Sequence, residues 1–251
     1  MKNICISIWQ TILEEIATEN DNPSLFIDDK ILGSKTFEDA LCWNLAFNLA
    51  TKSFNEQYIF ELFKNIISSN PKIVEYATED LLEIRKRDFA CTLLSIPFLY
   101  SKGYLSIQTY RMAHFLYTQG KTIFASFLQF RISTMFDIDI SPSAIIGKKT
   151  ILDHGTGIVI GGTSEIDHNV FIFHNVTLGS TGTKSGKRHP NVRNGVVLGA
   201  SSTILGNIEV GEGSIVAAGS VVLNDVPPYV TVAGNPARII GTSKNILQPD
   251  Q

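Results

Sequence analysis

The stretch from Ile140 to Gly179 reads ISPSAIIGKKTILDHGTGIVIGGTSEIDHNVFIFHNVTLG, and aliphatic side chains recur along it at every sixth position. The C-terminal half holds three such runs: Ile140, Ile146, Leu152 and Ile158; then, after a slip of two residues, Ile160, Ile166, Ile172 and Leu178; then Val192, Leu198, Ile204, Val210, Val216 and Val222. A period of six fits neither a helix nor an ordinary strand, but it fits short strands stacked coil on coil. Each coil leaves an aliphatic face that only its neighbour can cover, so the pattern predicts a solenoid with a continuous core.

The N-terminal half has a different periodicity. Ile4, Ile8, Ile12 and Ile16 recur every four residues, as on one face of a helix. The ranges 71–84, 106–119 and 121–136 also predict helices, and Pro142 blocks any continuation of the last one. We therefore predict an α+β protein with an all-helical domain over residues 1–138, a solenoid over 139–241 and a tail over 242–251.

Composition excludes several classes of protein. The net charge of −3 gives no reason to expect nucleic acid or an anionic membrane as a partner. The three cysteines are scattered and odd in number, so neither a disulfide framework nor a metal-finger spacing is present. The N-terminus lacks the regions of a signal peptide, and no stretch approaches the ~18 apolar residues of a membrane span. These features predict a cytoplasmic protein that does not bind membranes.

The repeat has one large interruption, between Leu178 and Val192. The intervening segment, GSTGTKSGKRHP over 179–190, is basic and rich in glycine. Loops that leave a solenoid often carry function, although such a composition also suits a plain solvated loop. Its ending, Arg188-His189-Pro190, joins a guanidinium and an imidazole to a rigid residue. A Walker phosphate-binding loop is not indicated, because the required Gly-Lys-Ser/Thr before a helix is missing.

A second polar cluster, Asp153-His154, lies within the coils. A lone histidine is more often structural than catalytic, but Asp139 precedes His154 by fifteen residues. In a coil of about eighteen residues, that spacing returns the chain close to its starting point one row below. A carboxylate near an imidazole can orient it and make it a general base near neutral pH. Because no activated serine or cysteine is evident, we expect direct transfer to an acceptor hydroxyl without a covalent intermediate.

These motifs together resemble the bacterial serine O-acetyltransferases over nearly the whole chain. The six-residue repeat alone indicates only the broader hexapeptide-repeat acyltransferase superfamily. The more specific segments are Arg85-Lys-Arg-Asp88, Gly103-Tyr104, Tyr110-Arg-Met-Ala-His114, Asp139, Asp153-His-Gly-Thr-Gly157, Val176-Thr-Leu-Gly179, Lys187-Arg-His-Pro190 and Ala233-Gly-Asn-Pro-Ala-Arg238.

The resemblance implies a fold, an activity and an assembly. The fold would be a left-handed parallel β-helix behind the helical domain. The activity would be transfer of acetyl from acetyl-CoA to the hydroxyl of L-serine, which gives O-acetylserine and CoA and feeds cysteine biosynthesis. Acetyl-CoA would be a co-substrate, with no permanently bound cofactor and no metal. Three β-helices would associate around a threefold axis, giving either a homotrimer or a hexamer in which helical domains join two trimers.

The resemblance also implies roles for single residues. His154 would be the general base that deprotonates serine, with Asp139 as its orienting partner. Asp88 and Asp153 would pair with the ammonium group of the amino acid. Arg188 would bind the serine carboxylate, for which a planar guanidinium is well suited.

Further roles concern the acetyl donor. His189 would hydrogen-bond the substrate or the developing oxyanion. The CoA arm would lie in the groove between two β-helices, where small residues allow close approach to the backbone. The residues expected along that groove are Gly179, Thr181, Ala200 and Ala218. Because the groove lies between subunits, trimerisation would be required for activity.

Several positions depart from the family pattern. Phe89 stands where the family commonly has proline, Gly162 replaces an acidic residue, Ser180 replaces a glycine, and His174 stands at a position often occupied by glutamine. The tail ends in Pro249-Asp250-Gln251 and lacks the terminal isoleucine that docks into cysteine synthase in many relatives, which argues against that complex. Feedback inhibition by cysteine, common in the family, stays open.

Three alternative functions remain from the sequence. The first is an acetyl-CoA-dependent O-acetyltransferase of a sugar, an antibiotic or homoserine. Asp88, Asp153 and Arg188 argue against a neutral sugar, because together they would bind a zwitterionic amino acid. The second is a zinc lyase resembling the γ-class carbonic anhydrases, which take two of their three histidine ligands from one coil at a spacing of five. The histidines of the repeat, His154, His168, His174 and His189, contain no such pair. The third is a scaffold without activity, against which the catalytic motifs argue.

Overall fold

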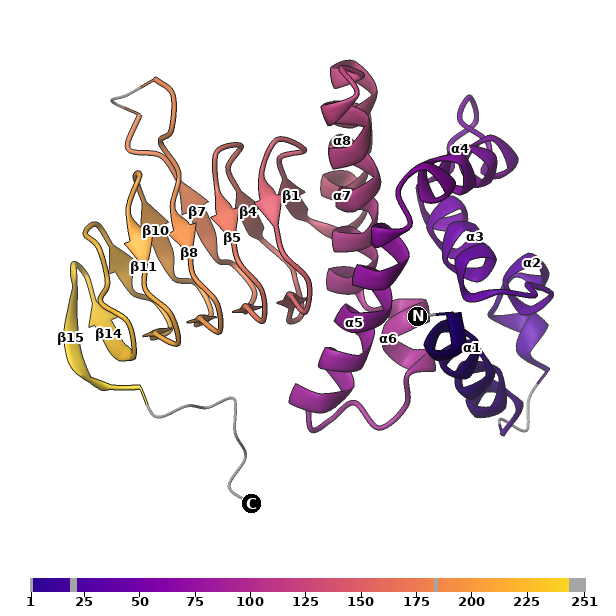
Figure 1. Ribbon diagram of the computed structural model, residues 1–251, viewed down its shortest axis with the longest axis horizontal. Helices are drawn as coiled ribbons and strands as arrows, with labels where there is room; N and C mark the ends of the chain where they lie inside the picture. The colour runs from indigo at the N-terminus through magenta and orange to yellow at the C-terminus, as the bar shows by residue number, and fades with distance from the viewer. Residues whose placement is uncertain (1, 19–21, 183–184, 244–251) are drawn as a thin grey trace.

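The computed structural model describes residues 2–18, 22–182 and 185–243, and places a helical part and a β-solenoid end to end (Figure 1). The helices are α1 (Lys2–Ala17), α2 (Asp29–Leu32), α3 (Phe37–Leu49), α4 (Glu56–Ser69), α5 (Lys72–Arg87), α6 (Ser95–Tyr100), α7 (Lys102–Thr118) and α8 (Thr122–Phe136), with a short 3₁₀ turn at Pro23–Leu25. Helix α7 begins earlier than the expected residue 106, because the Ser101 hydroxyl caps it by accepting a hydrogen bond from the Tyr104 N–H at 3.3 Å.

The solenoid consists of short strands that form three sheets, parallel except for the last strand of the third. The first sheet holds β1 (Ile138–Ile140), β4 (Ile158–Ile160), β7 (Thr177–Gly179), β10 (Thr203–Leu205) and β13 (Val221–Val222). The second holds β2 (Ile145–Ile146), β5 (Glu165–Ile166), β8 (Asn191–Val192) and β11 (Glu209–Val210). The third holds β3 (Ile151–Leu152), β6 (Phe171–Ile172), β9 (Val197–Leu198), β12 (Ile215–Val216), β14 (Val230–Gly234) and β15 (Ala237–Thr242).

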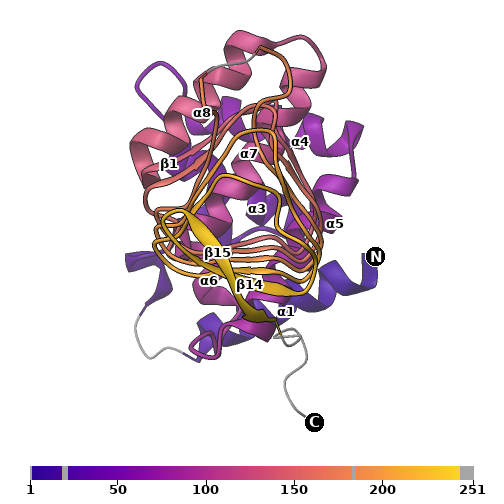
Figure 2. The ribbon, with the colours of Figure 1, turned by 90° about the vertical axis from the view of Figure 1, so that its left-hand side faces the viewer.

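Viewed along its axis, the solenoid has a triangular outline, with one sheet on each side (Figure 2). Each strand pairs in parallel with the equivalent strand of the next coil. The first coil takes twenty residues, since Ile138 pairs with Ile158, whereas Val159 pairs with Thr177 at the expected step of eighteen. The left-handed parallel β-helix expected from the resemblance is thereby confirmed as the fold class. At the far end, β14 and β15 pair antiparallel.

The aliphatic residues that recur at every sixth position form the core of the solenoid. Every residue of the three runs is buried. The slip of two residues falls within β4, where Ile158 and Ile160 both point inward and Val159 points out. The slip therefore marks a three-residue strand that places two side chains in the core, and it does not interrupt the stacking.

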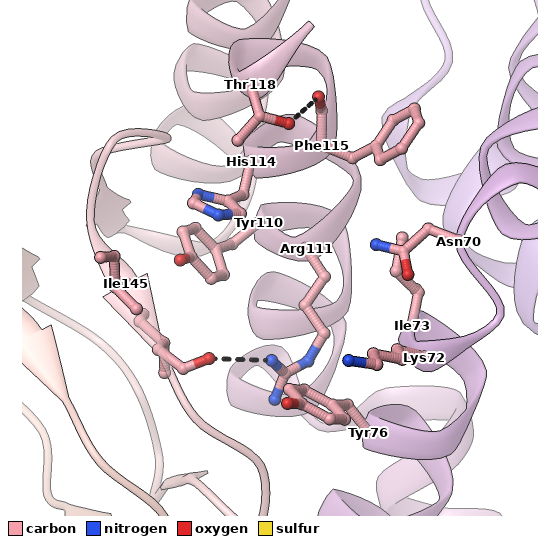
Figure 3. Close-up of a pocket in the computed structure, with 11 residues that line it drawn as sticks. Asn70, Lys72, Ile73, Tyr76, Tyr110, Arg111, His114, Phe115, Thr118 and Ile145 are labelled. Atoms are coloured by element: carbon pink, nitrogen blue, oxygen red, sulfur yellow. Dashed lines mark hydrogen bonds between the residues drawn. The ribbon is translucent and has the colours of Figure 1, made fainter.

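A buried ion pair ties the helical part to the first coil. Asp80 of α5 and Arg111 of α7 form an ion pair at 2.6 Å, and Arg111 also donates to the Gly147 carbonyl at 3.1 Å. The second carboxylate oxygen of Asp80 accepts the Thr150 N–H at 3.2 Å. Figure 3 shows Arg111 reaching from α7 toward the coil, with Tyr76 beside its guanidinium. Buried side chains of the two parts also belong to one hydrophobic cluster, so the parts share a continuous interior.

None of the helices that the structure describes is long and apolar enough to cross a bilayer. The predicted domain limits of 1–138, 139–241 and 242–251 lie close to the end of α8 and the end of β15 and stay an interpretation. Residues 249–251, on which the expectation about a cysteine synthase complex rests, lie outside the described residues.

Candidate active site

The turn after β3, residues 153–157, is pressed against the start of α7. A Cβ added to Gly103 would lie 1.9 Å from the Leu152 carbonyl oxygen, so only glycine permits this approach. Lys102 donates a hydrogen bond from Nζ to the Thr156 hydroxyl. On the other side, the Gly157 N–H donates to the Asp137 carbonyl at 2.7 Å. Asp153 and His154 are therefore held at the junction between the helical part and the solenoid.

Three of the predicted site residues line one pocket at this junction. Asp88, Asp153 and His154 face a space of about 310 Å³ between the end of α5, α6 and the turn after β3. Asp88 directly follows α5, and its Oδ1 accepts the Ala90 N–H at 2.9 Å, while no described residue bonds its Oδ2. Phe89 is 91% exposed, so its side chain points away from the protein while Asp88 lines the pocket.

The surroundings of Asp153 shift the pKa of its carboxyl group upward. Burial raises the pKa of Asp153, the neighbouring charge of Asp88 raises it further, and His154 acts in the opposite direction. Two carboxyl groups in one half-buried pocket repel each other when both are ionised. A bound cation removes that repulsion, so the pair is suited to an ammonium group.

The ring of His154 has few contacts. No hydrogen bond reaches it from any residue that the structure describes, and its aromatic neighbour is His174, with ring centroids 6.0 Å apart and planes at 83°. Asp139, its predicted partner, accepts a hydrogen bond from Gln129 Nε2 on Oδ1 at 2.6 Å. Oδ2 of Asp139 accepts none from the described residues. The orienting role of Asp139 stays a prediction.

Arg188 and His189 lie on a different corner of the solenoid. The Thr163 N–H donates to His189 Nδ1 at 3.1 Å, and the Thr163 hydroxyl is 2.8 Å from the same nitrogen. The Thr163 oxygen in turn accepts the backbone N–H groups of Arg188 and His189 at 3.0 and 3.1 Å. The His189 ring also packs on Gly161, where an added Cβ would lie 2.2 Å from Nε2.

These contacts determine the form of His189. Because Nδ1 accepts a backbone N–H, we assign the ring hydrogen to Nε2. Burial lowers the pKa of His189, and the charge of Arg188 lowers it further. His189 is therefore a neutral donor through Nε2, which suits a hydrogen bond to a carboxylate or an oxyanion. Arg188 itself is exposed.

The predicted site residues thus fall into two groups within one chain. The turn at 153–157 connects the third sheet to the first, whereas the segment at 180–190 connects the first sheet to the second. Neither Arg188 nor His189 lines the pocket of Asp88, Asp153 and His154. The predicted acetyl-CoA residues divide in the same way: Ala200 and Ala218 follow strands of the third sheet, and Gly179 and Thr181 lie at the end of the first sheet.

Comparison with known families identifies this architecture. The family model described as "Serine acetyltransferase, N-terminal" matches residues 8–109, and that of the "Bacterial transferase hexapeptide (six repeats)" matches residues 189–224. A serine acetyltransferase of Haemophilus influenzae is 44% identical over 242 residues, which cover 95% of this chain and 91% of that protein. The chain belongs to the serine acetyltransferase family.

Solved structures of serine acetyltransferases have the same fold. The enzyme of Brucella abortus in complex with coenzyme A has a TM-score of 0.92 and 43% identity, covering 95% of this chain and 97% of that one. The soybean enzyme complexed with serine has a TM-score of 0.91 and 42% identity, covering 94% and 99% of the two chains. The family resemblance predicted from the sequence motifs is confirmed.

Sequence reasoning missed several side chains of this serine acetyltransferase site. It did not foresee that Lys102, Gln129 and Thr163 contact the predicted residues, and it gave His174 no role in the acetyltransferase site. The register holds a signal for His174, because Leu152 pairs with Ile172 and so aligns His174 with His154. Among the residues described, no three His, Cys, Asp or Glu side chains form a group that could hold a metal ion.

Proposed function

We infer that this chain transfers the acetyl group of acetyl-CoA to the hydroxyl of L-serine, giving O-acetylserine and CoA. The observation that carries this inference is a pocket holding an imidazole beside two carboxyl groups, in a chain of the serine acetyltransferase family. The product is a precursor for cysteine biosynthesis. We propose that the enzyme works in the cytoplasm and holds no permanent cofactor.

The chemistry follows from the character of each group. Asp88 and Asp153 bind the serine ammonium, and Arg188 binds the carboxylate in bidentate fashion. His154 accepts the hydroxyl proton as the serine oxygen attacks the thioester carbonyl carbon. When the carbon–sulfur bond of the tetrahedral intermediate breaks, the protonated His154 returns the proton to the leaving thiolate. Asp139 stabilises the imidazolium that exists between these two steps.

We further propose that a second copy completes the site. The two groups of predicted residues lie on different corners, and a neighbouring β-helix in a trimer would bring the Arg188 corner of one copy to the His154 corner of another. The acetyl-CoA groove would then have Ala200 and Ala218 on one wall and Gly179 and Thr181 on the other. A homotrimer, or a pair of trimers, is thus the proposed active form.

The acceptor is tested by measuring CoA release from acetyl-CoA with serine, homoserine, threonine and several sugars offered separately. We expect release with serine, because the carboxyl pair and the guanidinium complement a zwitterion. A preparation that releases CoA only with a sugar or another hydroxyl compound lacking the amino-acid group would refute the proposed substrate.

Arg188 gives a sharper test of how serine is bound. Arg188→Ala is expected to raise the KM for serine at least tenfold, because the carboxylate loses a charge-assisted partner. The KM for acetyl-CoA should change less than twofold. Lys187 is a neighbouring cation that pairs with Glu165, so Lys187→Ala is the matched control. It should leave the KM values for serine and acetyl-CoA near those of the wild type. An unchanged serine KM in Arg188→Ala would remove Arg188 from the site.

A further inference from the structure

His174 occupies a defined place in the catalytic corner. His154, His174, Ala200 and Ala218 each lie two residues beyond a strand of the third sheet, and those strands pair in register. The four residues therefore stack along one edge of the solenoid, one per coil. His174 lies between the predicted general base on one side and the predicted acetyl-CoA wall on the other.

The backbone fixes this placement. The His174 carbonyl accepts the Ser201 N–H of the next coil at 2.9 Å, and the Asn175 N–H donates to the Thr156 carbonyl of the previous coil at 2.8 Å. The ring stands edge to face with that of His154. Centroid distances of 4.5–7 Å are usual for such aromatic pairs, so the contact restricts both rings.

The two nitrogens of His174 have different surroundings. Nδ1 is buried and has no hydrogen-bond partner among the described residues. Nε2 has none among them either, but it is not a buried atom. A buried N–H without an acceptor is rarer in proteins than an unused lone pair. We therefore assign the ring hydrogen to Nε2, so that Nδ1 carries the lone pair.

The unpaired Nδ1 makes a histidine energetically costly at this position. An unpartnered buried polar atom costs about 1–3 kcal/mol, and such an atom in a native protein calls for an explanation. An apolar side chain of similar size would fill the same space without that cost. Because Nδ1 has no partner among the described residues, a hydrogen-bonding role of this ring falls to Nε2.

We propose that His174 is a further catalytic residue, which donates a hydrogen bond from Nε2–H to the thioester oxygen as it becomes an oxyanion. The proposal rests on the serine acetyltransferase activity inferred above. His154 still takes the serine proton and returns it to the CoA thiolate, and His174 exchanges no proton. His189, the other neutral donor, lies on a different corner and would reach the same oxygen only from another copy.

Three substitutions separate donation from packing. His174→Gln keeps an N–H donor without the ring, His174→Phe keeps a ring without a donor, and His174→Ala removes both. Loss of one oxyanion donor typically lowers kcat by about 10²-fold. We expect that loss in the Phe and Ala variants and a kcat within tenfold of wild type in the Gln variant. The KM values for serine and acetyl-CoA should change less than threefold in all three.

Stability supplies a second readout. Because phenylalanine replaces the orphaned Nδ1 with an apolar ring, the thermal unfolding midpoint of the Phe variant should equal or exceed that of the wild type. His168→Gln, at an exposed histidine whose Nδ1 accepts the Lys148 N–H, is the control and should keep its activity. Wild-type activity in His174→Phe would overturn the proposal, as would a Gln variant as slow as Phe. If the wild-type protein itself forms no acetylserine, the proposed function fails instead.

Discussion

At the scale of single residues, the pocket is tuned by the surroundings of its carboxyl groups. The pKa of Asp153 is raised by burial and by the nearby charge of Asp88. Below its pKa the carboxyl group is neutral and no longer attracts an ammonium group. Because the pKa is raised, this loss begins at a higher pH than for an ordinary aspartate.

The expected result is a KM for serine that rises as pH falls toward the raised pKa of Asp153, while the KM for acetyl-CoA stays nearly constant. Asp153→Asn should have a high serine KM that depends much less on pH, because the titrating group is gone. Steady-state kinetics across pH 5–8 provide the measurement. A serine KM with the same acid dependence in wild type and Asp153→Asn would show that another group is responsible.

Residue roles were only partly predictable from the sequence. Asp88, Asp153 and His154 could be grouped through the resemblance, and the structure places them around one pocket. The link between Asp139 and His154 came from spacing and from the resemblance and stays a prediction, while the structure adds a hydrogen bond from Gln129 of α8 to Oδ1 of Asp139. Spacing within a repeat cannot report which helix packs against a strand, because that contact depends on the tertiary fold.

At the scale of elements, the contact between α7 and the turn after β3 transmits packing to the active site. Gly103→Ala would place a methyl carbon 1.9 Å from the Leu152 carbonyl oxygen, which is a steric clash, so either α7 or the turn must move. Overpacking of this kind costs about 1–3 kcal/mol of unfolding free energy. A displacement of about 1 Å in a catalytic group can lower the rate by about 10²-fold.

We therefore expect Gly103→Ala to unfold at lower denaturant concentration and to lose at least tenfold in kcat. Gly241→Ala in β15 is the matched control, since an added Cβ there meets nothing within 4 Å. Chemical denaturation and steady-state assays check both effects. A Gly103→Ala enzyme with wild-type kcat would show that the turn tolerates movement of α7.

The elements of the solenoid were the most predictable part of the fold. The six-residue runs identified its core because the aliphatic face of each coil is buried only when the next coil stacks on it. The length of the first coil was not predictable, since the extra residues at β4 looked like a slip in the pattern. That detail mattered, because the twenty-residue step is what aligns His174 with His154.

At the scale of the whole molecule, the division of the site between two corners sets the requirement for assembly. Spacing along the chain gave no sign of this division, because Asp153 and Arg188 are separated by a loop whose direction depends on the folded solenoid. Residues 183–184 of that loop lie outside the part of the chain that the structure describes. A single copy holds Asp88, Asp153 and His154 together and holds Arg188 and His189 apart from them.

Mixed assemblies test whether one copy completes the site of another. His154→Ala and Arg188→Ala should each be nearly inactive alone when assayed at low serine. Co-assembled in equal amounts, they should regain up to about one quarter of wild-type activity, because that share of the interfaces pairs an intact His154 with an intact Arg188 from the neighbouring copy. His154→Ala mixed with Asp153→Ala is the control and should regain nothing, since both lesions lie on the same corner. If both corners of a site came from one chain, every site in the first mixture would carry a lesion and no activity would return.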